Sequence, residues 1–339
     1  GYDAKCKYIY WPSRDLEGLH LPNAPTQVDA IRAFDSLREI HCDFCLTDQP
    51  SRANTLALLI APVVRPAIDG DTPMAVVDAP EMESGKGLLV RACSVLATGE
   101  EPYRIPFAGE EELEKQITQA LFRGSPFISI DNIKRQLESA TLESALTMSR
   151  WTGRVLGKNT EGIDVPQRAT WAATGNNLQL GSEVARRCYL IRLVKGSTRS
   201  REFRHPQLLA WVRAERARLI TALLTAIRAW YLAGCPKANT TSIGGFEEWC
   251  RVVGGILSFG GVEGFLENHG QFRADRDTER AEWEHFLLQL RDRMADRALL
   301  SGEIADLLGG DPSLRALLPG SLVEAADRGR AQLVYGIGR

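Results

Sequence analysis

The stretch that most constrains this chain is residues 74–89, with the sequence MAVVDAPEMESGKGLL. Residues 74–77 form an apolar run typical of a buried strand, and residues 88–90 begin an apolar helix face. The loop between them contains Ser84-Gly85-Lys86. This order of strand, Gly-Lys loop and helix is the layout of a phosphate-binding loop. In such a loop, backbone N–H groups surround the phosphates and the lysine reaches the outer ones. We therefore predict an α/β fold with a phosphate-binding loop here.

The loop departs from the usual pattern of such sites. Pro80 stands where a first glycine is expected, and Gly87 stands where Ser or Thr holds Mg²⁺. Glu81 and Glu83 add negative charge to a loop that would bind phosphate. The alternative interpretation is an ordinary strand–turn–helix with an incidental Gly-Lys pair.

Composition narrows the class of protein. The chain has 339 residues, of which 44% are hydrophobic and 25% charged, an ordinary globular balance with room for two or three domains. No apolar run approaches the roughly 18 residues of a membrane span, and no secretory signal pattern is present.

The net charge of −2 restricts any DNA contact to a local surface. The 7 scattered cysteines favour a reducing, cytoplasmic location. The start at Gly1 suggests a piece of a longer polypeptide.

Cys42 and Cys45 form a lone CxxC pair. A structural zinc site needs four ligands, and Cys6 is the one upstream candidate. We favour the interpretation that the pair belongs to the core of an amphipathic helix.

Three further apolar runs predict buried parallel strands. Residues 126–132 end in Asp131-Asn132, residues 168–177 end in Thr174-Gly-Asn-Asn177, and residues 188–193 directly follow Arg186-Arg187. Ligands of open parallel sheets bind at the carboxyl ends of the strands. We expect both arginines to lie at the same sheet edge as the nucleotide. The alternative interpretation is a set of core strands that end in solvated turns.

Residues 151–155 and 163–165 predict a β-hairpin whose polar tip, residues 156–162, contains Lys158. Most lysines at such tips are simply solvated.

The chain resembles an AAA+ ATPase core in four motifs taken in order. They are Gly85-Lys86, Ile130-Asp131-Asn132, Ala173-Thr-Gly-Asn-Asn177, and Ala185-Arg-Arg187 before a strand. The nearest likeness is to helicase domains of the superfamily III and MCM-like kind. These occur in primase–helicase replication proteins of phages, plasmids and genomic islands. The resemblance covers about residues 50–235.

The resemblance implies a role for each matched position. Lys86 would neutralise the outer phosphates of ATP, and Asp131 would hold Mg²⁺, while Asn132 occupies the usual position of the catalytic acid. Asn176, or Asn177, would position the attacking water. Arg186 or Arg187 would be an arginine finger that reaches the neighbouring subunit of a homohexameric ring.

Further site residues follow from the same resemblance. Arg154 and Lys158 would contact DNA in the pore, and Arg204 would contact the nucleotide from the lid entrance. The predicted nucleotide-binding set is Pro80, Glu81, Met82, Glu83, Ser84, Gly85, Lys86, Gly87, Leu88 and Arg204.

The implied architecture has an N-terminal segment with a helical collar (1–68), the AAA+ core with its parallel sheet (69–198), a helical lid (199–270) and a small winged-helix-like domain (278–339). Within it we expect a loop after Gly99, one long helix from His205 to Gly234, a polar linker over residues 269–277 and a small strand over residues 332–336.

The sequence thus predicts the motor domain of a mobile-element replication protein, an ATP-dependent DNA helicase. The expected cofactors are ATP and Mg²⁺. The expected partners are single-stranded or forked DNA, further copies of the chain and a primase or polymerase domain on the same polypeptide, with no membrane. The alternatives are a non-helicase AAA+ remodeller or loader, and a nucleotide-binding scaffold with weak hydrolysis.

Overall fold

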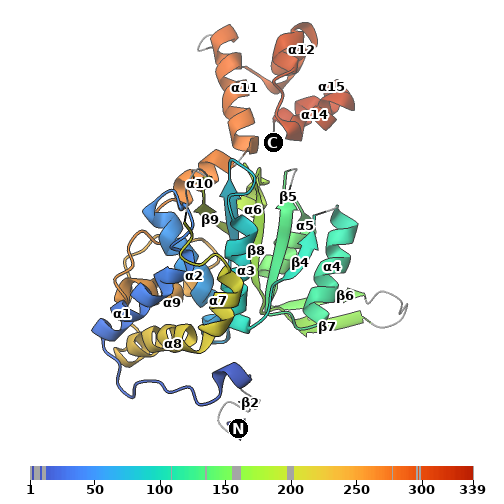
Figure 1. The fold of residues 1–339 in the computed structure, drawn as a ribbon. Coiled ribbons are helices and arrows are strands. Elements are labelled where there is room, and N and C mark those ends of the chain that lie inside the picture. Colours follow the sequence, from blue (N-terminus) through green and yellow to red (C-terminus); the bar gives the residue numbers. More distant parts are fainter. Residues whose placement is uncertain are drawn as a thin grey trace.

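A five-stranded parallel sheet forms the centre of the protein (Figure 1). Its order is β4 (Tyr103–Pro106), β5 (Phe127–Ile133), β8 (Thr170–Asn176), β3 (Met74–Ala79) and β9 (Cys188–Arg192). The computed structural model describes residues 2–3, 8–9, 13–107, 109–133, 136–154, 162–196, 202–276, 278–294, 297 and 299–338. The parallel sheet with helices on both faces confirms the predicted α/β fold.

One face of the sheet is covered by helices from both ends of the sequence. Residues of alternate positions in β3, such as Ala75 and Val77, share a core with these helices, as the two-residue period of a strand requires. The predicted collar and lid helices therefore share one core with the helix that follows the predicted phosphate-binding loop. They are α1 (Gln27–Leu37), α2 (Gln49–Val64), α3 (Lys86–Thr98), α7 (Leu208–Ala214), α8 (Arg216–Leu232) and α9 (Glu247–Phe259).

The opposite face carries α4 (Glu110–Phe122), α5 (Ala140–Thr147) and the short α6 (Ser182–Ala185). The predicted hairpin is confirmed as β6 (Arg150–Arg154) paired with β7 (Gly162–Pro166). Trp151 anchors it to α4, because its indole N–H donates to Oγ1 of Thr118 at 3.0 Å. The tip with Lys158 lies outside the described residues.

The C-terminal part consists of helices with a core of their own, which includes Phe286, Leu308 and Leu333. They are α11 (Thr278–Met294), α12 (Ser301–Gly310), α13 (Pro312–Arg315), α14 (Gly320–Asp327) and α15 (Arg330–Ile337). The preceding α10 (His269–Arg276) belongs to the core of the sheet instead. Two expectations were wrong. Residues 332–336 belong to α15 rather than to a strand, and the presumed linker contains α10, because Phe272 is buried against the sheet.

Two further expectations were wrong. The loop after Gly99 contains β4, an edge strand whose Ile105 is buried and whose end is Pro106, a residue that edge strands accept. The long helix is divided at Glu215, because the buried Arg216 turns toward α3 and donates from Nε to the carbonyl of Leu96 at 2.8 Å.

The remaining short elements are β1 (Tyr2–Asp3), β2 (Tyr8–Ile9), η1 (Arg14–Leu16), η2 (Arg38–His41) and η3 (Arg65–Ala67). Among the helices in the described ranges, none has both the length and the apolar character needed to span a bilayer.

Candidate functional site: the phosphate loop and its cavity

The predicted phosphate-binding loop, residues 80–85, joins β3 to α3 and turns at Gly85, whose φ of 89° lies in the left-handed region that favours glycine. A side chain there would also meet Phe44, since a Cβ atom would come within 2.9 Å of its ring. The N-terminus of α3 thereby faces the loop. Its first backbone N–H groups and the positive end of its dipole suit an anion.

Lys86 is held at the centre of the loop. Its Nζ donates to Oδ1 of Asn176 at 2.6 Å, to Oγ of Ser84 at 2.9 Å and to the carbonyl of Glu81 at 3.0 Å. Partial burial lowers the pKa of Lys86, and the charge of the nearby Asp78 opposes this shift. The structure thus brings the predicted phosphate lysine and the predicted sensor amide into direct contact.

The strand order explains this contact. β8 lies between β3 and β5, and its Asn176 pairs in register with Ala79 at the end of β3. The fully buried carboxylate of Asp78 fixes the turn after Asn176, because it accepts the N–H of Leu178 at 3.0 Å. The ends of the two strands are therefore held together by side chains as well as by the sheet.

Asp131 lies on the far side of β8 and is bound to it. Oγ1 of Thr174 donates to Oδ1 of Asp131 at 2.5 Å and accepts the N–H of Asn132 at 3.2 Å. The φ of Asn132 is 55°, a left-handed conformation that Asn adopts at lower cost than Glu. The local backbone therefore favours Asn at the position where an AAA+ resemblance leads one to expect Glu.

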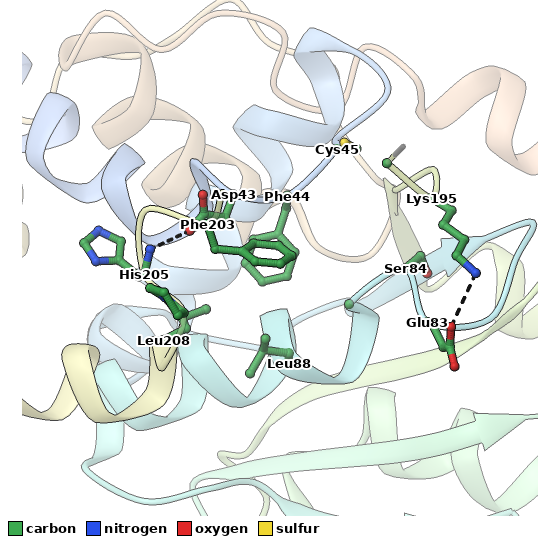
Figure 2. A pocket seen from close by; sticks show the side chains of 13 residues that line it. Asp43, Phe44, Cys45, Glu83, Ser84, Leu88, Lys195, Phe203, His205 and Leu208 are labelled. Carbon is green, nitrogen blue, oxygen red and sulfur yellow. Dashed lines mark hydrogen bonds and ion pairs between the residues drawn. The ribbon is translucent and has the colours of Figure 1, made fainter. Parts of the chain in front are cut away.

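A cavity of about 390 Å³ opens beside the phosphate loop (Figure 2). This volume lies in the range of small-molecule sites, roughly 300–1,000 Å³. Its walls include two aromatic rings, Phe44 and Phe203, together with the apolar Leu88 and Leu208. The lining residues are Asp43, Phe44, Cys45, Glu83, Ser84, Gly85, Leu88, Lys195, Gly196, Phe203, His205, Pro206 and Leu208.

Carboxylates from the segment after α1 hold the outer wall of the cavity. Asp43 accepts the backbone N–H groups of Arg204 and His205, both at 2.9 Å. The His205 ring stacks on Trp211 with 3.8 Å between centroids. The exposed Arg204 side chain pairs with Glu39 at 3.1 Å, so its predicted contact with a nucleotide stays a prediction.

Sequence reasoning missed Phe44, Phe203 and His205 as cavity residues. They come from segments distant in sequence from the loop, and no local pattern marks them. Cys45 also lines the cavity, whereas Cys42 is exposed, so neither belongs to the helix core we expected. Among the described residues, no group of three or more His, Cys, Asp or Glu side chains could hold a metal ion.

The two arginines lie at the opposite edge of the sheet, contrary to our expectation. The carbonyl of Arg187 accepts the N–H of Met74 at 2.9 Å, and Met74 begins the strand whose other end carries the phosphate loop. Because β9 is parallel to β3, residues that precede β9 must lie at this amino edge. Glu183 pairs with Arg186 at 2.9 Å and with Arg187 at 3.0 Å.

The other predicted residues are placed as follows. Met82 is exposed at the loop, and a Cβ atom at Gly87 would have nothing within 4 Å. Arg154 ends β6, and β7 leads directly into the start of β8, so the hairpin arises at the amino edge of the sheet.

The carboxylate of Asp131 and the open space at Gly87 suit a magnesium ion that is bound together with a nucleotide. Mg²⁺ is usually bound through one or two carboxylates together with substrate phosphates and water. Asp131 supplies one carboxylate beside Thr174, and open space surrounds Gly87. When bound, the ion would neutralise charge that develops on the phosphates.

No model of a known protein family matches the chain, and no curated protein matches it. Among solved structures, it is similar to the NrS-1 C-terminal region in its A form, with 14% identity and a TM-score of 0.47 over 90% of this chain and 67% of that one. It is similar to another structure of that region (305–718), with 13% identity and a TM-score of 0.42 over 74% of this chain and 55% of that one. It is also similar to JCV helicase, with 14% identity and a TM-score of 0.35 over 74% of this chain and 65% of that one.

Proposed function

We propose that the chain is an ATP-dependent DNA helicase motor that assembles as a ring and moves along single-stranded DNA. The observation that carries the proposal is the contact between Lys86 and Asn176 at the carboxyl edge of the sheet. Lys86 and the amide of Asn176 lie there beside a cavity large enough for a nucleotide base, and Asp131 is bonded to Thr174 on the same strand as Asn176.

The chemistry follows from these side chains. Lys86 would neutralise the outer phosphates, and the α3 N-terminus would bind their oxygens. The Asn176 amide would orient the attacking water, while Phe44 and Phe203 would enclose the base. Asp131 would hold Mg²⁺.

The arginines at the amino edge support an oligomer as the active form. The length of β3 separates Arg187 from the phosphate loop of its own chain, so Arg187 would act on a neighbour's nucleotide. A guanidinium supplied in trans stabilises the charge of the transition state. In this proposal the ring is required for hydrolysis.

A strand-separation assay on a forked duplex tests the helicase proposal against a remodeller or loader. We expect ATP-dependent unwinding that Lys158→Ala abolishes while basal ATP hydrolysis stays near wild type. Lys115→Ala is the matched control, because Lys115 is a partly exposed lysine on α4 whose partner is Glu111. Unchanged unwinding by Lys158→Ala would remove the hairpin from the mechanism, and hydrolysis without any unwinding would favour the remodeller.

A nucleotide-binding scaffold is the second candidate. The left-handed backbone at Asn132 and the missing hydroxyl at Gly87 favour it. A scaffold would bind ATP with the same residues and turn it over very slowly.

A further inference from the structure

Lys195 lies directly beyond β9 and lines the same cavity as the phosphate loop. Its Nζ is 3.3 Å from a carboxylate oxygen of Glu83, an ion pair that crosses the mouth of the loop (Figure 2). Glu83 has a left-handed φ of 58°, and its side chain is 83% exposed. The backbone turn thus presents this carboxylate on the solvent side of the loop.

The pair is easily exchanged. Its 3.3 Å separation exceeds the roughly 2.7–2.9 Å typical of close ammonium–carboxylate hydrogen bonds. Ion pairs with so exposed a partner contribute little to stability, because water solvates both charges. A polyphosphate carries more negative charge than one carboxylate and would meet Lys195 in the less solvated cavity.

We propose that Lys195 is a phosphate-binding residue of the nucleotide site and that Glu83 competes with the phosphate chain for it. This inference rests on the nucleotide site proposed above. Lys86 begins α3 and Lys195 follows β9, so the two ammonium groups would approach the phosphates from different elements. The competition also gives a role to an acid in a phosphate loop, because Glu83 would weaken the binding of ligands that cannot displace it.

Isothermal titration of the full chain with ATP, ADP and adenosine tests the proposal. Lys195→Gln should weaken ATP and ADP binding about tenfold, since a hydrogen bond between charged groups is lost, and should leave adenosine binding unchanged. Lys115→Gln is the control, because Lys115 also pairs with an exposed acid, Glu111, at 2.6 Å. It should bind all three ligands as wild type does.

Glu83→Gln should tighten ATP binding about two- to fivefold. The double variant then separates direct contact from simple charge compensation. If Lys195 binds phosphate, Lys195→Gln still weakens ATP binding in the Glu83→Gln background. If Lys195 only neutralises Glu83, its effect disappears in that background and the proposal is overturned.

Lys86→Ala distinguishes a failure of the nucleotide site from a failure of the role of Lys195. The proposed nucleotide site is wrong if the wild-type chain binds no ATP. It is also wrong if the Lys86→Ala variant binds ATP as tightly as the wild type does. If Lys86→Ala abolishes binding and Lys195→Gln binds ATP as wild type does, the site stands and the role of Lys195 alone is overturned.

Discussion

The Nζ atom of Lys86 lies 2.6 Å from Oδ1 of Asn176, although the two residues are 90 positions apart in sequence. The contact joins the start of α3 to the end of β8, because β8 and β3 are neighbours in the sheet. It couples a group suited to hold phosphate with a group suited to orient water.

Asn176→Ala should lower the ATP turnover number roughly 100-fold and change ATP affinity much less, because the amide acts on the reacting water. Steady-state kinetics and nucleotide titration measure the two quantities. Asn177→Gly is the control, since glycine accepts the left-handed φ of 46° at that position. A larger loss of turnover in the Asn177 variant would transfer the sensor role to that residue.

Gly87→Ser should lower the Mg²⁺ concentration needed for half-maximal turnover, because it supplies the missing hydroxyl ligand. A Cβ atom fits there without contact, and replacement of a helical glycine should add about 0.5 kcal/mol to the free energy of unfolding. Gly87→Ala should also raise the free energy of unfolding but should leave the Mg²⁺ concentration for half-maximal turnover unchanged. Identical Mg²⁺ dependence in both variants would show that Asp131 and the phosphates suffice.

Arg187→Ala should abolish hydrolysis while ATP binding persists, because Arg187 would serve a neighbouring subunit. A mixture of Arg187→Ala and Lys86→Ala chains should regain part of the activity, since one type of mixed interface pairs an intact loop with an intact arginine. Mass in solution with ATP present should exceed that of a monomer. An active monomer, or a mixture without any recovery, would contradict the trans role.

Acid should destabilise the fold partly through His41, which is 6% exposed. Burial, assisted by Arg38 and Arg52, lowers the pKa of His41 from 6.5 to about 4. The folded state therefore favours the neutral imidazole. The contribution of neutral His41 to the free energy of unfolding is fully present above pH 6.5 and is lost as the pH falls from 6.5 to 4.

For His41, the loss should reach about 2 kcal/mol at pH 5 and about 3 kcal/mol below pH 4. Urea unfolding at pH 8 and pH 5 measures it, with His41→Gln as the comparison. The pH dependence of the free energy of unfolding should be smaller by that amount in the variant. Equal dependence in both proteins would contradict a neutral buried His41.

The sequence predicted the sheet best where strands are long and fully buried. The runs that form β3, β5 and β8 are apolar and end in polar residues. The sequence therefore predicted that they are strands and that Asp131 and Asn176 lie at strand ends. β4 escaped notice because its four residues alternate in burial, follow Pro102 and end in Pro106. Residues 332–336 were misassigned because a short apolar run suits a strand and a helix equally.

The candidate site was only partly predictable for a related reason. Chain order indicates that Arg186 and Arg187 precede a strand, and a parallel strand begins at the edge opposite its ligand-binding end. Applied fully, that rule would have placed both arginines correctly. Phe44, Phe203 and Lys195 reach the cavity through tertiary packing, which no local pattern encodes.

Steady-state ATP hydrolysis by the purified chain, measured with and without single-stranded DNA and compared with Lys86→Ala, shows whether the loop at Lys86 belongs to a DNA-stimulated ATPase. We expect turnover that single-stranded DNA increases and that Lys86→Ala abolishes. Nucleotide binding without turnover in the wild-type chain, or turnover that survives Lys86→Ala, would contradict this expectation.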